Sequence, residues 1–240
     1  MTHTTTTLGG ERGGLHPLLE SGVIAVARLP AAAGLRAAAR ALAAGGVGAV
    51  EITLTTPGAI EAIGELASDR DLACVVGAGT VLDESAACEV IDAGARFVVS
   101  PTLTPAVIRV CRDRDIPCLP GAFTPTEIVE AWRAGAPLVK LFPAAAVGPG
   151  YLRDLLAPLP FLRLVPSGGV SLENVGDWIR AGAAAVSVGS ALLPAALVRS
   201  EAAGGAGGAG GAGGAELTLR ARAFVERVAQ ARAQLAGGAA

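Results

Sequence analysis

Short apolar segments alternate with longer amphipathic segments along most of the chain, beginning at Val23. The apolar runs are rich in Val, Ile and Leu and are predicted to be strands: residues 23–27, 49–53, 73–77, 97–100, 118–120, 138–141, 163–166 and 185–189. Between and after them, apolar positions follow helical spacing over residues 30–44, 56–68, 83–93, 104–115, 124–134, 150–156, 171–181 and 216–235. Strands that are apolar on both faces and alternate with helices predict a parallel sheet whose outer face is covered by helices.

A repeating unit of two strands and two helices indicates that this sheet closes on itself. Ala-Gly pairs at 44–45, 93–94, 134–135 and 181–182 each end a helix just before a strand, where glycine suits a left-handed C-terminal cap. Four such units predict an α/β fold with a single (β/α)8 TIM barrel, preceded by a short N-terminal helix at 15–20. A doubly wound open sheet is the alternative, and eight strand–helix units without a GxGxxG fingerprint favour the barrel.

Composition divides the chain into four parts. Residues 1–14 are rich in Thr and Gly and are predicted to be a flexible tail, and residues 15–200 are predicted to form the barrel domain. Residues 201–215 contain a Gly-Gly-Ala repeat without side chains to bury, which predicts a flexible linker. Residues 216–240 are predicted to contain a C-terminal helix that docks on the barrel through Leu217, Phe224 and Val228.

Charge and histidine content exclude several classes of function. The formal net charge is -2 at pH 7 and the arginines are scattered singly, so no basic surface for nucleic acid or an anionic membrane is expected. Both histidines, His3 and His16, precede the first predicted strand, so a His-ligated zinc site or a Ser-His-Asp triad lacks its imidazole. Neither a metal site nor a cofactor is expected.

Cysteine use and hydropathy indicate a soluble, cytoplasmic protein. The 4 cysteines have no CxxC spacing, which is typical of reduced, structural thiols. The N-terminus has no basic region followed by an apolar stretch, so a secretory signal is not expected. The charge-free residues 181–198 approach the length of a membrane span, but Gly, Ser and Pro194 interrupt them, which suits a buried strand and loop better.

Lys140 is the only lysine among the 19 basic residues. It lies in the sixth predicted strand, where side-chain alternation points it away from Val139 and Leu141 and into the mouth of the barrel. Burial disfavours the charged ammonium, and a neutral amine attacks carbonyls and forms a Schiff base. The alternative is a structural lysine paired with Glu51, but an arginine would serve that purpose and cannot form an imine. The sequence therefore favours a catalytic role for Lys140.

Glu51 is the only acidic residue within a predicted strand. Taken alone, it is as consistent with a salt bridge to an interior cation as with catalysis. Beside Lys140 it would complete a nucleophile with a proton shuttle, relaying protons to the substrate directly or through one water.

Two loops that contain glycine follow the seventh and eighth predicted strands. Ser167, Gly168 and Gly169 open a predicted helix, where exposed backbone amides and the helix N-terminus attract an anion. Gly189 and Ser190 complete the usual location of a phosphate in such barrels. Either loop alone is explained equally well by a tight turn, but the two together predict a phosphate site.

Seven motifs lie at the ends of the predicted strands: Val50–Leu54, Val76–Val81, Val99–Pro101, Pro120–Glu127, Val139–Pro143, Pro166–Val170 and Val188–Ser190. Taken in this order, they resemble the 2-keto-3-deoxy-6-phosphogluconate (KDPG) aldolase / 4-hydroxy-2-oxoglutarate (KHG) aldolase family over residues 22–194. The resemblance implies a class I aldolase that needs no metal or cofactor, acts on a phosphorylated keto acid and assembles as a homotrimer.

The resemblance also assigns roles within the site. Lys140 would form the Schiff base, Glu51 would be the general acid/base, and Thr80 would help to hold the pyruvyl carboxylate. Phe142 and Pro101 would line the pocket. The phosphate would be held by Gly168, Gly169 and Ser190, with Ser167 standing where many relatives have a threonine.

One position departs from the family pattern. Many members carry an arginine four residues after the catalytic glutamate, where it grips the substrate carboxylate, and here that position is Thr55. Arg28, at the end of the first predicted strand, could supply the charge instead. The departure leaves the preferred substrate open among KDPG, its galactonate epimer and KHG.

The predicted reaction is cleavage of KDPG to pyruvate and glyceraldehyde 3-phosphate through an imine on Lys140, with cleavage of KHG to pyruvate and glyoxylate as a second activity. Two alternatives stay open on the sequence. A phosphosugar isomerase or epimerase would share the phosphate loops and use Glu51 as a base, with Lys140 only electrostatic. A non-catalytic trimeric scaffold would need none of the polar residues at the strand ends.

Overall fold

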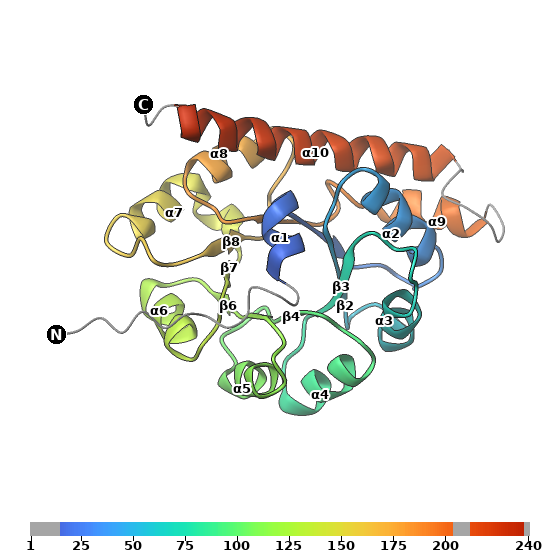
Figure 1. Cartoon of the computed structure of the whole chain (residues 1–240), viewed down its shortest axis with the longest axis horizontal. Helices are drawn as coiled ribbons and strands as arrows, with labels where there is room; N and C mark the ends of the chain where they lie inside the picture. Colours follow the sequence, from blue (N-terminus) through green and yellow to red (C-terminus); the bar gives the residue numbers. More distant parts are fainter. Residues whose placement is uncertain (1–14, 204–211, 238–240) are drawn as a thin grey trace.

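The computed structural model describes residues 15–203 and 212–237 and has parallel strands at its centre. The strands are β1 (Val23–Ala27), β2 (Ala49–Thr53), β3 (Val75–Gly79), β4 (Val98–Val99), β5 (Cys118–Leu119), β6 (Gly121–Ala122), β7 (Val139–Leu141), β8 (Leu164–Pro166) and β9 (Val186–Val188). Figure 1 shows helices α2 to α8 in a ring around them. The helices are α1 (Leu15–Ser21), α2 (Leu35–Ala44), α3 (Ala59–Ala67), α4 (Glu84–Asp92), α5 (Pro105–Asp113), α6 (Pro125–Arg133), α7 (Gly148–Leu156), α8 (Val175–Arg180), α9 (Ala195–Ala203) and α10 (Ala212–Gly237).

The strands pair as two sheets within the described residues. One has the order β5-β4-β3-β2-β1-β9 and the other the order β6-β7-β8, and every pairing is parallel. This arrangement confirms the predicted parallel α/β fold. The two sheets do not by themselves make the closed eight-stranded barrel that the sequence predicts.

Pro120 accounts for one difference between the predicted and observed strands. The sequence predicts a single strand over residues 118–120, whereas the structure has β5 before Pro120 and β6 after it. A proline has no N–H to donate to a ladder, so it interrupts the pairing there. Its carbonyl still accepts a hydrogen bond from the Lys140 N–H at 2.9 Å.

The third strand lies two residues later than predicted and ends at Gly79, which the prediction leaves outside the strand. The prediction of 73–77 becomes Val75–Gly79 in the structure. Glycine is unfavourable in strands in general, so only a specific packing requirement explains it there. A Cβ on Gly77 would lie 2.5 Å from the ring of Phe97, so this strand needs glycine to admit the neighbouring side chain.

The core has an inner and an outer part. The inner cluster contains side chains from the strands together with Leu15 and Leu18 of α1, which confirms the predicted entry helix. A larger cluster lies between the strands and the surrounding helices. The strands are buried on both faces, as their continuous apolar character predicts.

The C-terminal part differs from the predicted linker. Helix α9 extends to Ala203 and α10 begins at Ala212, so both ends of the predicted flexible linker 201–215 are helical. The Glu201 carboxylate explains the early start of α10, because it accepts a 2.6 Å hydrogen bond from the N–H of Gly214 in its first turn. Residues 204–211, the predicted tail 1–14 and residues 238–240 lie outside the described residues.

Helix α10 docks on the rest of the protein. Its Leu217, Phe224 and Val228 are buried, as predicted, and it packs against α2, α8 and α9. Figure 1 shows it lying along one side of the ring of helices. Arg232 adds polar contacts by donating 2.8 Å and 3.0 Å hydrogen bonds to the carbonyls of Leu19 and Ala184. No helix in the described part of the chain is long and apolar enough to cross a membrane.

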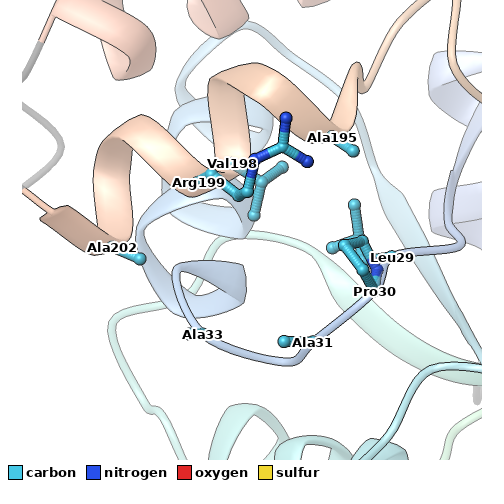
Figure 2. A pocket seen from close by; sticks show the side chains of 8 residues that line it. All are labelled: Leu29, Pro30, Ala31, Ala33, Ala195, Val198, Arg199 and Ala202. Carbon is cyan, nitrogen blue, oxygen red and sulfur yellow. The ribbon is translucent and has the colours of Figure 1, made fainter.

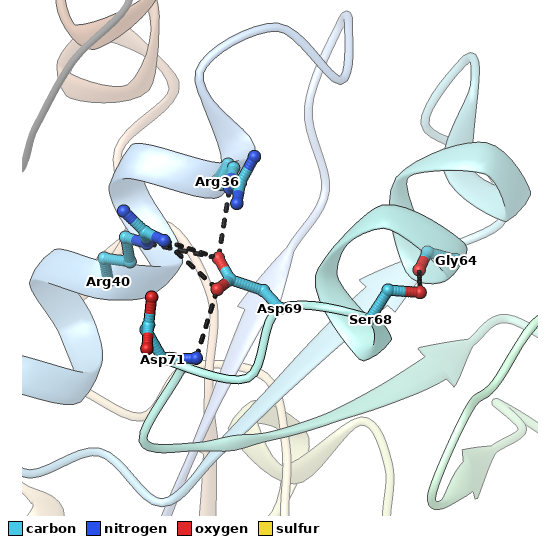
Figure 3. A network of polar contacts seen from close by, with 6 residues as sticks. All are labelled: Arg36, Arg40, Gly64, Ser68, Asp69 and Asp71. Carbon is cyan, nitrogen blue, oxygen red and sulfur yellow. Dashed lines mark hydrogen bonds and ion pairs between the residues drawn. The ribbon is translucent and has the colours of Figure 1, made fainter.

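An ion-pair network joins α2 to the loop after α3 (Figure 3). The carboxylate of Asp69 accepts hydrogen bonds from Arg40 at 2.9 Å and from Arg36 at 3.0 Å, and its side chain is only 3% exposed. The Arg40 hydrogen bond holds the pKa of the Asp69 carboxyl below its ordinary value. A carboxyl with a lowered pKa stabilises the folded state above its unfolded pKa, and this contribution is lost as the pH falls through the folded pKa.

Asp69→Asn is therefore expected to lower the unfolding temperature at pH 7, since the two guanidinium groups lose their shared anion. The difference from the unsubstituted protein should shrink below about pH 4, where an aspartate in the unfolded chain becomes protonated. Thermal unfolding followed by circular dichroism from pH 7 to pH 3 measures this. A difference that stays the same over that range would show that the charge of Asp69 contributes nothing.

Candidate active site

Lys140 and Glu51 meet in the interior although they lie in different sheets. Lys140 is the middle residue of β7 and Glu51 the middle residue of β2. The Lys140 Nζ is 3.7 Å from the Glu51 Oε1, and the two side chains are 6% and 1% exposed. The structure thus brings together the amine and the carboxylate that the sequence singles out, in a place largely shielded from water.

The carboxylate of Glu51 has no hydrogen-bond partner for either oxygen within the described residues. Burying a charged group without hydrogen bonds costs free energy. Most buried polar groups in folded proteins therefore have a hydrogen-bond partner. An ion pair to Lys140 at 3.7 Å offsets part of this cost. A carboxylate held in this way is available to accept a proton from an adjacent reacting group and, once protonated, to return it.

Gly79 leaves the space that Glu51 occupies. It lies at the end of β3, and a Cβ there would be 2.0 Å from the Glu51 Oε1. No side chain fits at that distance, and the contact is with the catalytic candidate itself. Glycine at this position is therefore a condition for the approach of Glu51 to Lys140.

Gly79→Ala is expected to reduce turnover at least about 100-fold, because displacement of a reacting group by about 1 Å costs that much. Gly150→Ala is the matched control, since a Cβ on Gly150 would meet nothing closer than 3.7 Å. Steady-state cleavage rates of the two variants, with circular dichroism spectra to show that both fold, provide the measurement. Full activity in Gly79→Ala would contradict this role of the glycine.

A cavity of about 480 Å³ adjoins Lys140. Its lining includes most of the predicted site residues: Arg28, Lys140, Phe142, Ser167, Gly168, Gly169, Gly189 and Ser190. The Lys140 Nζ lies 5.3 Å from the centre of the Phe142 ring, so the amine is at an aromatic wall of this cavity. The two predicted phosphate loops and the amine thus share one cavity.

The loop after β8 adopts a backbone that requires glycine. Gly168 and Gly169 have φ values of 89° and 75°, in the left-handed region. The predicted helix does not begin directly after them, however, since α8 starts only at Val175. Asn174 explains the delay, because its side chain accepts a hydrogen bond from the Ser171 N–H and donates one to the Gly169 carbonyl. Any anion in this loop would meet backbone N–H groups rather than the first turn of a long helix.

Four predicted site residues do not line this cavity: Glu51, which lies behind Lys140, and Thr55, Thr80 and Pro101. Thr55 is exposed, and its hydroxyl lies 2.9 Å from that of Thr53. Thr80 follows Gly79 directly and is half-buried, with a φ of 59°. Pro101 is half-buried, and a Cβ on Gly121 would lie 2.2 Å from its carbonyl oxygen.

Sequence reasoning missed Ser187, a buried serine of β9 that lines the cavity. It stands between Val186 and Val188, so a single polar side chain interrupts an apolar strand. The same signal identified Glu51 and could have identified Ser187.

A second cavity of about 370 Å³ lies between the loop after β1 and α9 (Figure 2). Its lining is mostly apolar, with Leu29, Pro30 and Val198 among the side chains and Arg199 at one side. It shares Ala195 with the cavity at Lys140 but includes none of the predicted site residues.

Comparison with known proteins identifies the family of this site. The sequence model of the family described as KDPG and KHG aldolase matches residues 16–204. The chain belongs to this family. The match covers both catalytic candidates and both glycine-containing loops, and it makes the protein an aldehyde-lyase of the aldolase type rather than an isomerase or a scaffold.

Individual relatives agree with this assignment. The chain is 39% identical over 180 residues to the 2-dehydro-3-deoxy-phosphogluconate aldolase of Pseudomonas aeruginosa, which covers 75% of this chain and 81% of that protein. It is 38% identical over 158 residues to the KHG/KDPG aldolase of Escherichia coli K12, covering 65% and 74% of the two chains. The crystal structure of the KDPG aldolase of Legionella pneumophila, which holds pyruvate as a covalent carbinolamine, superposes with a TM-score of 0.76 at 29% identity, covering 87% and 96%.

Proposed function

We propose that this protein is a class I aldolase that cleaves KDPG to pyruvate and glyceraldehyde 3-phosphate, with Lys140 as the Schiff-base residue. The observation that carries the proposal is the buried Lys140 Nζ, 3.7 Å from Glu51, at the wall of a cavity that two glycine-containing loops also line. An amine in this position attacks a ketone, and no arginine could replace it. The covalent carbinolamine of pyruvate in the Legionella relative is the chemistry that the proposal requires.

In the proposed mechanism, the neutral amine of Lys140 attacks the C2 ketone of the substrate to give a carbinolamine. Glu51 takes up the proton that the Lys140 ammonium gives up to become the amine, and returns it to the departing hydroxyl, so that water leaves and an iminium forms. The iminium draws electrons from the C3–C4 bond, which breaks as the C4 hydroxyl gives its proton to the Glu51 carboxylate, and glyceraldehyde 3-phosphate departs. Glu51 then delivers this proton to C3 of the remaining enamine, and water hydrolyses the iminium to release pyruvate and the amine.

The rest of the cavity would bind the substrate. Backbone N–H groups of the loops at Gly168, Gly169 and Ser190, with Ser167 and Gly189 beside them, would hold the phosphate. Arg28 lines the same cavity, which favours a contact with the phosphate over the contact with the carboxylate that its sequence position suggests. Phe142 would pack on the reacting carbons. Thr80 would hold the pyruvyl carboxylate and Pro101 would line the pocket. For these contacts the pyruvyl end of the substrate would extend beyond this cavity, toward β3 and β4.

The family assignment also supports proposals about assembly. We infer that the two sheets form one closed (β/α)8 barrel, because the Ser167–Ser187 bridge joins β8 to β9 and the Ala184 N–H donates to the Leu164 carbonyl. A barrel domain over residues 15–200 with a C-terminal helix docked on it, a homotrimeric assembly and a cytoplasmic location belong to the same proposal. Sedimentation equilibrium would test the trimer.

KHG is the second candidate substrate, because a relative at 38% identity carries both activities in its name. The experiment compares kcat/KM for KDPG, its galactonate epimer and KHG, with pyruvate formation as the readout. We expect the two phosphorylated substrates to be preferred over KHG, since the loops around Gly168 and Ser190 would bind a phosphate that KHG lacks. Equal or faster cleavage of KHG would contradict the proposed phosphate site, and no pyruvate from any of the three would contradict the aldolase.

A further inference from the structure

Two buried threonines of β2 and the loop after it hold the backbone on both sides of Arg28. Thr53 and Thr56 are 0% and 1% exposed. The Thr53 hydroxyl donates a 3.2 Å hydrogen bond to the carbonyl of Ala27, and the Leu29 N–H donates a 3.1 Å hydrogen bond to the Thr56 hydroxyl. The peptide group before Arg28 and the peptide group after it are thus both anchored to the neighbouring strand.

Arg28 itself is exposed and lines the cavity at Lys140. No ion pair within the described residues holds its guanidinium. The position of its side chain therefore depends on how its backbone is held. An exposed arginine on a free loop would lose much of its binding energy to the entropy of ordering.

The hydroxyl of Thr55 strengthens the same arrangement. It lies 2.9 Å from the Thr53 hydroxyl, so it is joined to the threonines that anchor the loop. Thr55 therefore supports the threonine that anchors the backbone at Arg28.

We propose that Thr56, together with Thr53, is a positioning residue that holds Arg28 at the cavity to bind the phosphate of the substrate. The proposal rests on the proposed aldolase function and on the phosphate contact of Arg28. Preorganisation of this kind raises affinity without adding a contact to the substrate.

A double-mutant cycle tests whether Thr56 acts through Arg28. Arg28→Gln is expected to raise KM for KDPG about tenfold or more, since it removes a charge-assisted hydrogen bond. Thr56→Val, which keeps the shape but removes the hydroxyl, should raise KM about three- to tenfold. In the Arg28→Gln background, Thr56→Val should add no further change, because the side chain that it positions is gone. The same factor in both backgrounds would overturn the proposal.

Control variants separate positioning from damage to the fold. Thr56→Ser keeps the hydroxyl, so its KM for KDPG should equal that of the unsubstituted protein. Thr218→Val removes a hydroxyl on α10 that donates to the Ala41 carbonyl at 3.0 Å, and it should leave KM unchanged. Both valine variants lose the hydrogen bonds of one buried or half-buried hydroxyl, so their unfolding temperatures provide a comparison for the stability cost. A serine variant with the KM of Thr56→Val would overturn the proposal.

Trapping with pyruvate and borohydride separates failure of the inference from failure of the proposed function. Pyruvate has no phosphate, so Thr56→Val should form the reduced adduct on Lys140 at the rate of the unsubstituted protein. A slower rate in Thr56→Val would show that the threonine supports the reacting residues generally, which overturns the inference. Absence of an adduct in the unsubstituted protein would instead overturn the proposed function.

Discussion

Lys140→Arg is expected to lower the rate of KDPG cleavage by about 10⁴-fold or more, to the level left when a covalent nucleophile is removed. The arginine keeps a positive charge next to Glu51, so the ion pair in the interior is retained. It stays protonated, however, and its guanidinium cannot form the imine that the mechanism requires. Pyruvate release measured with purified protein gives the rate.

This variant distinguishes the aldolase from a purely electrostatic lysine. If Lys140 acted only through its charge, arginine would preserve most of the activity. Near-normal turnover in Lys140→Arg would therefore contradict the proposed mechanism. Its unfolding temperature serves as the control, and we expect it to change far less than the activity because the charge of the buried pair is conserved.

Glu51→Gln is expected to lower kcat about 10² to 10⁴-fold, the range that general acid–base catalysis contributes. The glutamine has almost the same shape, so the space beside Gly79 stays filled and the geometry around Lys140 is maintained. It can neither accept nor deliver the proton that carbinolamine dehydration and enamine protonation need. KM should change much less than kcat, since Glu51 is not placed in the phosphate loops.

Single-turnover trapping locates the effect of Glu51→Gln. The reduced pyruvyl adduct should still form on Lys140, but more slowly, because the amine is present and proton transfer is impaired. An unchanged rate of both adduct formation and cleavage would show that Glu51 is only the counter-ion of Lys140. Gly79→Ala should resemble Glu51→Gln in this assay, since both withdraw the carboxylate from the amine.

Much of the site could be predicted because it depends on local pattern. An apolar strand with a single charged residue, as around Lys140 and Glu51, is unusual enough to be seen in the sequence alone. In parallel α/β folds the ends of the strands converge, so the loops at Gly168 and Gly189 could be expected beside the amine. The structure places all of them within reach of one cavity.

Other features depend on contacts between distant residues and were not predictable. The start of α10 is set by Glu201, which contacts a glycine 13 residues away. The start of α8 depends on Asn174, whose side chain competes with the helix for backbone groups. The anchoring of the backbone at Arg28 by Thr56 also joins distant parts of the chain. Thr56 lies 27 positions after Leu29 and 29 positions after Ala27, and its hydroxyl contacts the backbone of both. Local propensity carries no information about such pairs.

The most direct test of the account is incubation with pyruvate and sodium borohydride, followed by mass spectrometry of the intact protein and its peptides. Lys140 is the only lysine of the sequence, so peptide mapping assigns an adduct without ambiguity. The account predicts one reduced pyruvyl group on Lys140 and loss of cleavage activity in proportion to it. Continued cleavage of KDPG with no adduct on Lys140 would contradict the central claim.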